Sequence, residues 1–282
     1  MYNAIFESSN GEKYVFGVNG GTVFDMDVGN GVPVDIGTSQ GFAQIGETVE
    51  NQKISGRPIN VNGVIYQSID ESKKRMRRVF APFASGRLIF DGKYYIYVYV
   101  KSTPTFSPVK GNGKFSMQLY APYPFFRSLD EKNVSIGAII PSFSFPVNYS
   151  EGHIFGLKQS EKYKNVFNAG DVVVPFKVSM VASGTSENPV VTNLQTMNFL
   201  KLNGTLNVGD SAVIYRDDQG LLRAELKSDG ELRDIISWID EESSLFDLSV
   251  GDNLISVTDN QDGENLSTRF YYNPAVVSVY ES

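Results

Sequence analysis

The sequence of 282 residues contains no cysteine, a single histidine and a single tryptophan. Without cysteine the chain can form no disulfide, and it offers no thiol nucleophile, no thiolate-bound zinc and no iron–sulfur cluster. One histidine excludes a metal site built from several histidines, and any catalytic triad would have to use His153 as its base. We expect His153, which lies in the connection EGHIFG, to be an ordinary loop residue.

Long apolar runs are also missing from the sequence. No segment approaches the roughly 20 apolar residues of a membrane-spanning helix. The first residues, MYNAIFESSNGEKYVF, lack the basic region and apolar stretch of a secretion signal. We therefore predict a protein that is made in a cytoplasm and does not insert into a membrane, which also fits the absence of cysteine.

Catalytic motifs are absent as well. The sequence has no GxxxxGK[ST] phosphate loop, no GxGxxG before a helical pattern and no GxSxG nucleophile elbow. Asp240, Glu241 and Glu242 could hold a cation or act on a glycoside, but a solvated turn is the favoured interpretation. The segment 259–265 is a poor calcium loop because its glycine comes one position too early. We predict no enzymatic activity, no metal and no cofactor.

The charge balance is acidic, with a formal net charge of −7. Such a balance argues against general nucleic-acid binding, which needs a basic face. One stretch is strongly basic despite the acidic balance of the chain. It contains Lys73, Lys74, Arg75, Arg77 and Arg78. These side chains could contact nucleic acid, meet an acidic face of a copy or partner, or cover neighbouring surface with their long stems. We favour the protein surfaces over nucleic acid.

The residues that are abundant indicate β structure. Hydrophobic residues make up 41% and aromatic residues 12% of the chain, and glycine occurs 26 times. The clearest hairpin joins Leu88–Phe90 to Tyr94–Val100 through Asp91 and Gly92. Similar Asn-Gly or Asp-Gly pairs, which suit hairpin turns, recur at 10–11, 19–20, 30–31, 62–63, 112–113, 203–204, 229–230 and 262–263.

Helices are predicted at only two places among these strands. The first covers about Asp70–Phe83, begins with a cap at Ser68 or Asp70 and stops before Gly86. The second is short, around Leu232–Trp238. The apolar stripe of the first helix consists of Ile69, Met76, Val79, Phe80 and Phe83.

The composition changes near residue 130, where prolines and small polar residues become frequent. We expect a domain boundary there, with one domain at 1–130 and another at 131–282. From Asp171 onward, short strands at close spacing predict an antiparallel sandwich. Residues 131–170 are expected to form a linker and uncertain first strands.

The segment Gly17–Glu47 is rich in glycine and small polar residues yet carries spaced apolar side chains. Glycine-rich strands have weak register and lose much entropy on ordering. We therefore predict that Asn30–Ile45 forms an arm or hairpin that packs against a neighbouring subunit, with a hairpin inside one protomer as the alternative. The expected contact residues are Asn30, Val32, Val34, Ile36, Phe42 and Ile45.

An ordered series of segments carries a resemblance to a known family. GRPINVNGVI at 56–65, the basic helix, LIFDGKYYIYVYVKSTPTF and GKFSMQLYAPYPFFRS at 113–128 form its first half. SENPVVTNLQ, LNGTLNVGDSAVIYRD and SSLFDLSVGDNLISV form its second half. Taken together, they resemble the distal tail protein family, or Dit, of long non-contractile phage tails. Residues 130–170 match less well.

The resemblance implies a mainly β protein, with an N-terminal β-sandwich that carries one α-helix and hairpins, and a C-terminal galectin-like antiparallel β-sandwich. It implies a structural hub at the distal end of a phage or prophage tail, synthesised in the bacterial host cytoplasm. Such a hub forms a homo-oligomer, expected to be a hexameric ring. The ring joins the tail tube protein to a tail-associated lysin-type protein and carries receptor-binding or baseplate proteins. The basic residues expected to face the ring or its neighbours are Lys73, Lys74, Arg77 and Arg78.

Two other functions stay open at this point. A carbohydrate-binding module that contributes directly to host cell-wall adsorption would use Trp238 to stack on a sugar. Its apolar neighbours in DIISWID favour a buried or half-buried side chain instead. A cell-wall hydrolase is the other alternative, and the missing catalytic residues argue against it.

Overall fold

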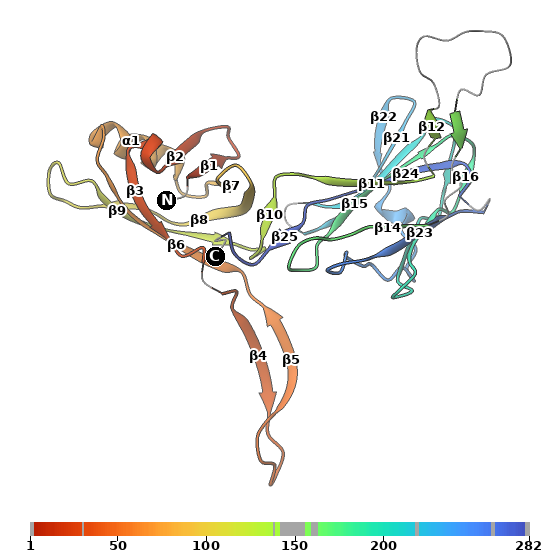
Figure 1. Ribbon diagram of the computed structural model, residues 1–282, viewed down its shortest axis with the longest axis horizontal. Coiled ribbons are helices and arrows are strands. Elements are labelled where there is room, and N and C mark those ends of the chain that lie inside the picture. The colour runs from red at the N-terminus through yellow and green to blue at the C-terminus, as the bar shows by residue number, and fades with distance from the viewer. Residues whose placement is uncertain are drawn as a thin grey trace. The chain divides into compact units, whose positions relative to one another are not determined.

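The computed structural model describes residues 3–29, 31–137, 139–141, 156–158, 163–217, 220–260 and 263–279. The chain folds into two compact units (Figure 1). Unit 1 consists of Met1–Asp130 together with Ala275–Ser282, and unit 2 consists of Glu131–Pro274. The C-terminal residues thus group with unit 1, although the expected second domain, 131–282, included them.

Unit 1 is built on a long antiparallel sheet in the order β2-β1-β7-β8-β9-β6-β3. Along β1 and β6, buried and exposed residues alternate, so one face of the sheet is covered and the other meets solvent. The short strands β10 and β25 pair with each other, and β10 also pairs with β8. The strands are β1 Ala4–Ser8, β2 Lys13–Phe16, β3 Thr22–Met26, β6 Arg57–Ile65, β7 Ser85–Phe90, β8 Tyr94–Phe106, β9 Lys114–Ala121, β10 Phe126–Ser128 and β25 Ala275–Val276.

The covered face of this sheet packs against α1, Ile69–Val79, which is the one α-helix among the described residues. Met76 and Val79 of the helix are buried, as is Phe80 directly after it. The Phe80 ring stacks on Phe6 of β1 with 4.6 Å between the ring centroids. Burying side chains of this size contributes about 1.5–3 kcal/mol each, so the apolar stripe accounts for the position of the helix.

The predicted helix Asp70–Phe83 was too long, because α1 ends at Val79. Phe83 adopts a left-handed φ of 67° and is 98% exposed, so it lies outside the apolar stripe. The predicted side-chain capping of the helix N-terminus is also wrong. Ser68 occupies the N-cap position, but its side chain makes no capping hydrogen bond.

The predicted hairpin at Asp91 and Gly92 is confirmed, since these residues connect β7 to β8 with φ values of 46° and 66°. Positive φ at both positions is the requirement of a type I′ turn. The predicted turn at Asn62 and Gly63 is wrong, because both residues lie inside β6. A Cβ at Gly63 would lie 2.6 Å from the Val23 carbonyl oxygen, so this glycine allows close strand pairing instead.

A separate two-stranded hairpin leaves unit 1 between β3 and β6. Its strands are β4, Val34–Ser39, and β5, Thr48–Ile54, and they pair only with each other in the sheet order. In Figure 1 this hairpin projects away from the rest of unit 1. The predicted segment Asn30–Ile45 contains β4, whereas the second strand of the hairpin, β5, lies beyond the predicted end. The predicted contact with a neighbouring subunit stays a prediction.

Unit 2 contains two larger antiparallel sheets, in the orders β11-β24-β15-β20-β21-β22 and β14-β23-β17-β18. Buried side chains from both sheets, such as Phe270 and Ile255, form its core. This arrangement, with that of unit 1, confirms the predicted mainly β fold class. The strands are β11 Lys132–Ile136, β14 Tyr163–Asn165, β15 Phe176–Ala182, β17 Val190–Asn193, β18 Phe199–Lys201, β20 Ser211–Arg216, β21 Leu222–Ser228, β22 Glu231–Asp234, β23 Leu254–Thr258 and β24 Leu266–Tyr272.

Smaller elements complete unit 2. The pairs are β12, Ile139–Pro141, with β13, Gly156–Lys158, and β16, Ser186–Glu187, with β19, Thr205–Leu206. The short helix predicted around Leu232–Trp238 is wrong. Its first part, up to Asp234, belongs to the edge strand β22, and its last part forms only the turn η2, Ile236–Trp238, with 3-10 geometry.

A buried asparagine holds the chain immediately before β23. The Asn253 side chain is fully buried, and its Nδ2 donates to the carbonyl oxygens of Ser249, Gly251 and Val166 at 2.8, 3.1 and 3.2 Å. Its Oδ1 accepts a hydrogen bond from Ser249 N at 2.9 Å. The Val166 and Gly251 carbonyl oxygens also accept hydrogen bonds from Asn253 N and Asn168 N, so the side chain adds a second bond to each. These side-chain bonds give a physical reason for the asparagine in the segment LSVGDNLISV.

Candidate assembly interface

The described residues contain no group of three or more histidine, cysteine, aspartate or glutamate side chains that could hold a metal ion. Within the acidic run 240–242, the Asp240 carboxylate accepts hydrogen bonds from Lys201 Nζ and Glu242 N, each at 2.9 Å. The bond from Lys201 lowers the pKa of Asp240 to about 2. Asp240 therefore serves as a structural acceptor. His153 lies outside the described residues.

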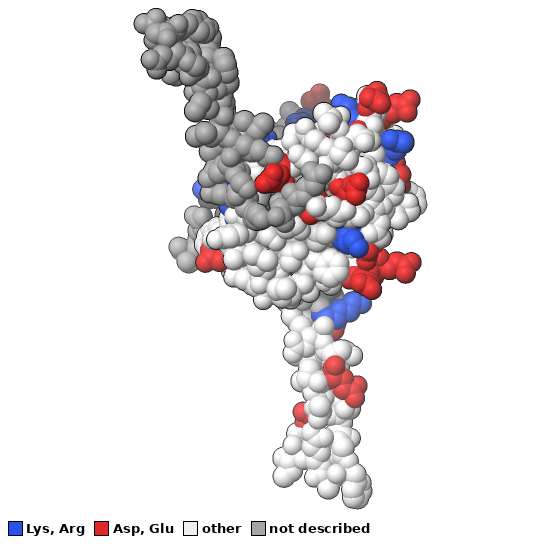
Figure 2. All heavy atoms as spheres, turned by 90° about the vertical axis from the view of Figure 1, so that its right-hand side faces the viewer, with Lys and Arg blue, Asp and Glu red and all other residues white. Residues whose placement is uncertain are grey.

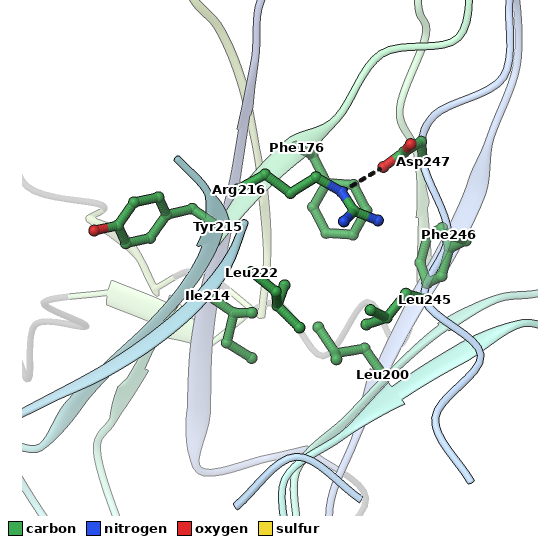
Figure 3. A pocket seen from close by; sticks show the side chains of 9 residues that line it. All are labelled: Phe176, Leu200, Ile214, Tyr215, Arg216, Leu222, Leu245, Phe246 and Asp247. Carbon is green, nitrogen blue, oxygen red and sulfur yellow. Dashed lines mark hydrogen bonds and ion pairs between the residues drawn. The ribbon is translucent and has the colours of Figure 1, made fainter. Parts of the chain in front are cut away.

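Unit 2 contains a narrow cleft with apolar walls (Figure 3). Arg216 Nε lies 3.4 Å from Asp247 Oδ1, and this ion pair spans part of the cleft, while Tyr215 points away from the other side chains. The cavity volume is about 20 Å³, which is room for about one water molecule. It is a packing gap rather than a ligand pocket. Its lining residues are Phe176, Leu200, Ile214, Tyr215, Arg216, Leu222, Leu245, Phe246 and Asp247.

Trp238 is half-buried at the end of η2. A Cβ placed on Gly204 would lie 2.3 Å from the Trp238 ring atom Cε3, so the ring packs directly against this glycine. The Trp238 carbonyl oxygen accepts a hydrogen bond from Asn203 N at 2.6 Å. These contacts give the tryptophan a packing role within unit 2, and sugar stacking at this position stays a prediction.

The hairpin β4–β5 has one apolar face and one polar face. Asp35 lies opposite Lys53 on the polar face, and the apolar side chains lie on the other. Figure 2 shows few charged side chains on the projecting hairpin. An isolated two-stranded hairpin is at best marginally stable in water, and a solvated apolar face adds to this difficulty. The apolar side chains are Val34, Ile36, Val49 and Ile54, which are 50, 56, 52 and 53% exposed.

The tip of this hairpin carries two apolar side chains that are entirely solvated. Phe42 and Ile45 reach the full exposure of an extended chain, at 107 and 102%. The predicted contact residues Val34, Ile36, Phe42 and Ile45 are therefore together on one projecting element. Val32, which precedes β4, is half-buried, and Asn30 lies outside the described residues.

The basic residues of α1 contact other parts of unit 1. Arg78 Nε donates to the Glu12 carboxylate at 3.0 Å. Lys73 and Arg77 lie over the ring of Phe106 at 5.6 and 5.0 Å from its centroid. These contacts help to hold the helix on the sheet. A contact of Lys73, Lys74, Arg77 or Arg78 with a neighbouring subunit stays a prediction.

Unit 1 also has an open groove of about 390 Å³ at the end of the sheet formed by β3, β6 and β9. Val23 and Val64, which are 49 and 40% exposed, supply apolar surface there. No local sequence signal points to this groove, because it depends on which strands pair. The lining residues are Val23, Phe24, Asp25, Asn62, Gly63, Val64, Lys114 and Phe115.

Arg57 at the start of β6 is only 2% exposed. Its guanidinium lies 4.9 Å from the centroid of the Phe126 ring. Nη2 donates to the Val277 carbonyl oxygen at 2.9 Å, and Nη1 donates to the Val28 carbonyl oxygen at 3.4 Å. Burial lowers the pKa of Arg57, but from a value so high that the group stays charged near neutral pH. Arginine in GRPINVNGVI thus joins distant segments of unit 1.

The comparisons with known proteins agree with this architecture. A family model described as "Siphovirus-type tail component, C-terminal domain" matches residues 169–275. The structure of the Dit protein of phage SPP1, described as a paradigm of the hub adsorption apparatus in phages that infect Gram-positive bacteria, is similar with a TM-score of 0.67. The match has 12% identity and covers 96% of this chain and 98% of that chain.

Structures of the phage p2 baseplate in its activated conformation are also similar. The form with Ca has a TM-score of 0.52 and 12% identity, and the match covers 99% of both chains. The form with Sr has the same TM-score and identity, with 96% of this chain and 97% of that chain covered. No curated protein matches the sequence. At this level of identity, the structural matches establish a shared fold.

The family match in unit 2 and the shared fold over almost the whole chain agree with the ordered series of segments in the sequence. Neither half of the resemblance rests on a single motif. Residues 169–275 therefore match the siphovirus-type tail component, C-terminal domain, and the chain shares the fold of the SPP1 Dit protein, in agreement with the family that the sequence resemblance indicated.

Proposed function

We propose that this protein is the structural hub of a long non-contractile phage or prophage tail. The hub is a hexameric ring that joins the tail tube protein to the tail tip or baseplate. It provides attachment sites for a tail-associated lysin-type protein and for receptor-binding proteins. The observation that carries this proposal is the uncovered apolar face of the hairpin β4–β5, in a chain that shares the fold of the SPP1 Dit protein.

The hairpin acts as an arm toward the next copy in the ring. It spans Val34–Ile54, which is 21 residues and falls within the range of about 20–30 residues that each partner supplies to a standard interface. Closed cyclic rings use heterologous contacts, in which one patch of each copy meets a different patch of the next. An element that projects from its own unit suits such a contact. Covering its apolar face then supplies the stability that an isolated hairpin lacks.

The proposed location and partners are based on the descriptions of the similar structures. The SPP1 relative is described as part of a hub, and the p2 relatives belong to a baseplate. By this likeness, the present protein is located in the virion at the distal end of the tail, after synthesis in the bacterial host. We propose a structural and not an enzymatic role for it.

Deletion of the hairpin tests the proposal. Because β3 and β6 are hydrogen-bonded antiparallel neighbours, a short glycine-containing loop can replace Val34–Ile54 without separating them. We expect the variant to keep a cooperative thermal melt and β-type circular dichroism but to form no rings. Electron microscopy and light scattering should show rings for the unmodified protein, alone or with tail partners. Rings formed by the deletion variant would refute the role of the arm.

Point variants give a matched control for this deletion. Ile36→Ser and Val49→Ser change the apolar face of the hairpin, whereas Asp35→Ser and Asn51→Ser change the polar face. We expect only the first pair to weaken ring assembly. Equal effects of the two pairs would show that the apolar face has no special role. A strictly monomeric unmodified protein, even with tail partners, would count against the hub as a whole.

A further inference from the structure

We propose that residues 275–279 act as a strap that completes unit 1 only after unit 2 has been synthesised. Unit 1 is discontinuous, since Ala275–Ser282 belongs to it although unit 2 intervenes in the sequence. A ribosome makes the chain from its N-terminus, so Met1–Asp130 emerges long before its last partner segment. The full stability of unit 1 thereby depends on a segment that is synthesised only after unit 2.

The strap is paired with the sheet of unit 1. In β25, Ala275 lies opposite Arg127 and Val276 lies opposite Phe126 of β10. Strand β10 pairs in turn with β8, where Arg127 lies opposite Tyr95. The strap is therefore the outermost strand of a continuous hydrogen-bonded series that reaches the central sheet. Without it, β10 would be a three-residue strand with an open edge.

The strap also covers core side chains of unit 1. Ala275 is fully buried, and Val276 and Val279 pack against the core cluster of this unit. Phe126, whose neighbours include the strap, is fully buried and meets the Phe90 ring edge to face, with 5.5 Å between the centroids. Loss of the strap would expose apolar surface that is otherwise excluded from water.

A hydrogen bond to a buried side chain also links the strap to the interior of unit 1. Arg57 Nη2 donates to the Val277 carbonyl oxygen across 220 positions of sequence. A buried guanidinium that loses one of its acceptors carries an uncompensated desolvation cost. Removing the strap therefore affects the interior of unit 1 directly. These strap contacts all lie within unit 1, so the effect should be confined to that unit.

Amide hydrogen exchange on the purified protein tests this proposal. One variant ends after Pro274, and a second keeps the full chain but carries Ala275→Asp at the fully buried position. We expect exchange in β8 and β10 to become about tenfold faster or more in both variants, because the local opening free energy falls. Exchange in β15 and β24 of unit 2 should change by less than about twofold. Val208→Asp, at a site in unit 2 that is 71% exposed, is the control.

Complementation separates a specific strap from a general loss of folding. The synthetic peptide AVVSVYES, residues 275–282, should restore slow exchange in β8 and β10 of the truncated protein, and a scrambled peptide should not. Unchanged protection of unit 1 in the truncated protein, or equal loss in both units, would overturn the proposal. Aggregation of the truncated protein without a matching loss of unit 1 protection in Ala275→Asp would overturn it as well.

The consequence for assembly rests on the proposed ring and is measured separately. Truncated chains mixed with unmodified chains should be excluded from rings, and the peptide should restore their entry. If unmodified chains form no rings, the hub proposal fails while the exchange result still decides on the strap. If truncated chains enter rings as readily as unmodified ones, the strap is not required for assembly.

Discussion

Replacing Asn253 by alanine is expected to destabilise unit 2 strongly. The side chain is fully buried and bonds backbone groups on both sides of the loop before β23. Alanine can neither donate to the carbonyl oxygens of Ser249, Gly251 and Val166 nor accept from Ser249 N. Because the site is closed to solvent, water cannot replace all of these bonds without a rearrangement of the loop.

The magnitude follows from the bonds that are lost. Four hydrogen-bonding contacts of the side chain, between 2.8 and 3.2 Å, disappear in the variant, and the two hydrogens of Nδ2 are shared among three of them. At a net value of about 1 kcal/mol each, the free energy of unfolding falls by roughly 3–4 kcal/mol. A domain with the size of unit 2 changes its melting temperature by about 2–4 °C for each kcal/mol, so we expect a decrease of roughly 6–16 °C.

Thermal and urea unfolding, followed by circular dichroism, measure this effect. Asn260→Ala is a suitable control, since Asn260 is exposed and its Nδ2 donates to the exposed Glu187 carboxylate, at 3.0 Å. The control should change the free energy of unfolding by less than about 0.5 kcal/mol. If Asn253→Ala melts within about 2 °C of the unmodified protein, the buried bonds do not hold the loop before β23.

Other substitutions test the core and the titrating groups. Phe80→Ala should lower the free energy of unfolding of unit 1 by about 3–5 kcal/mol, as measured by urea unfolding, because it removes a fully buried ring. The Tyr14 hydroxyl is buried with no hydrogen-bond partner in the described structure, and burial raises its pKa to about 12. Its contribution to stability is fully present below the ordinary tyrosine pKa near 10 and is lost as the pH rises toward 12, at about 1.4 kcal/mol per pH unit. Alkaline melts should therefore show a shallower decline for Tyr14→Phe than for the unmodified protein, and parallel declines would contradict the assignment. The pKa of Asp240 is lowered, so its contribution is present above the ordinary value near 4 and is lost as the pH falls toward 2. Asp240→Asn should flatten the acid decline in the melting temperature over that range, and an unchanged decline would show that the bond with Lys201 is not responsible.

Local sequence signals predicted structure well where the deciding contacts are local. The turn at Asp91 and Gly92 depends on the backbone freedom of those residues, and the flanking strands pair across it. Asn62 and Gly63 present the same kind of pair, but β3 and β9 flank them on both sides and keep them in an extended strand. The identity of these distant neighbours is absent from the local pattern, so the turn prediction failed there.

For the helix α1, the sequence predicted the apolar stripe but not the residue at which the helix ends. Its position behind β6 and its apolar stripe through Met76, Val79 and Phe80 could be read from spacing alone. Its end could not, because Phe83 satisfies the helical spacing but occupies a left-handed backbone conformation beyond the helix. The hydrogen bond between Arg57 and Val277 could not be predicted from local sequence patterns, because no periodicity connects positions 220 residues apart.

The hairpin β4–β5 shows why a candidate interface is harder to predict than a core. Val34 and Ile36 alternate with polar residues in the way that any half-buried strand does, and the sequence pattern alone does not reveal what covers them. The structure shows that the protomer itself does not bury these two side chains, because both are at least half exposed within their own unit. An apolar face that its own unit leaves in water calls for a cover from another molecule. We propose another copy of the chain as this cover, because a closed ring pairs one patch of each copy with a different patch of the next. Under the proposed hub function, the hairpin β4–β5 would stabilise the ring and not the protomer, so its deletion should abolish assembly and leave the thermal melt intact.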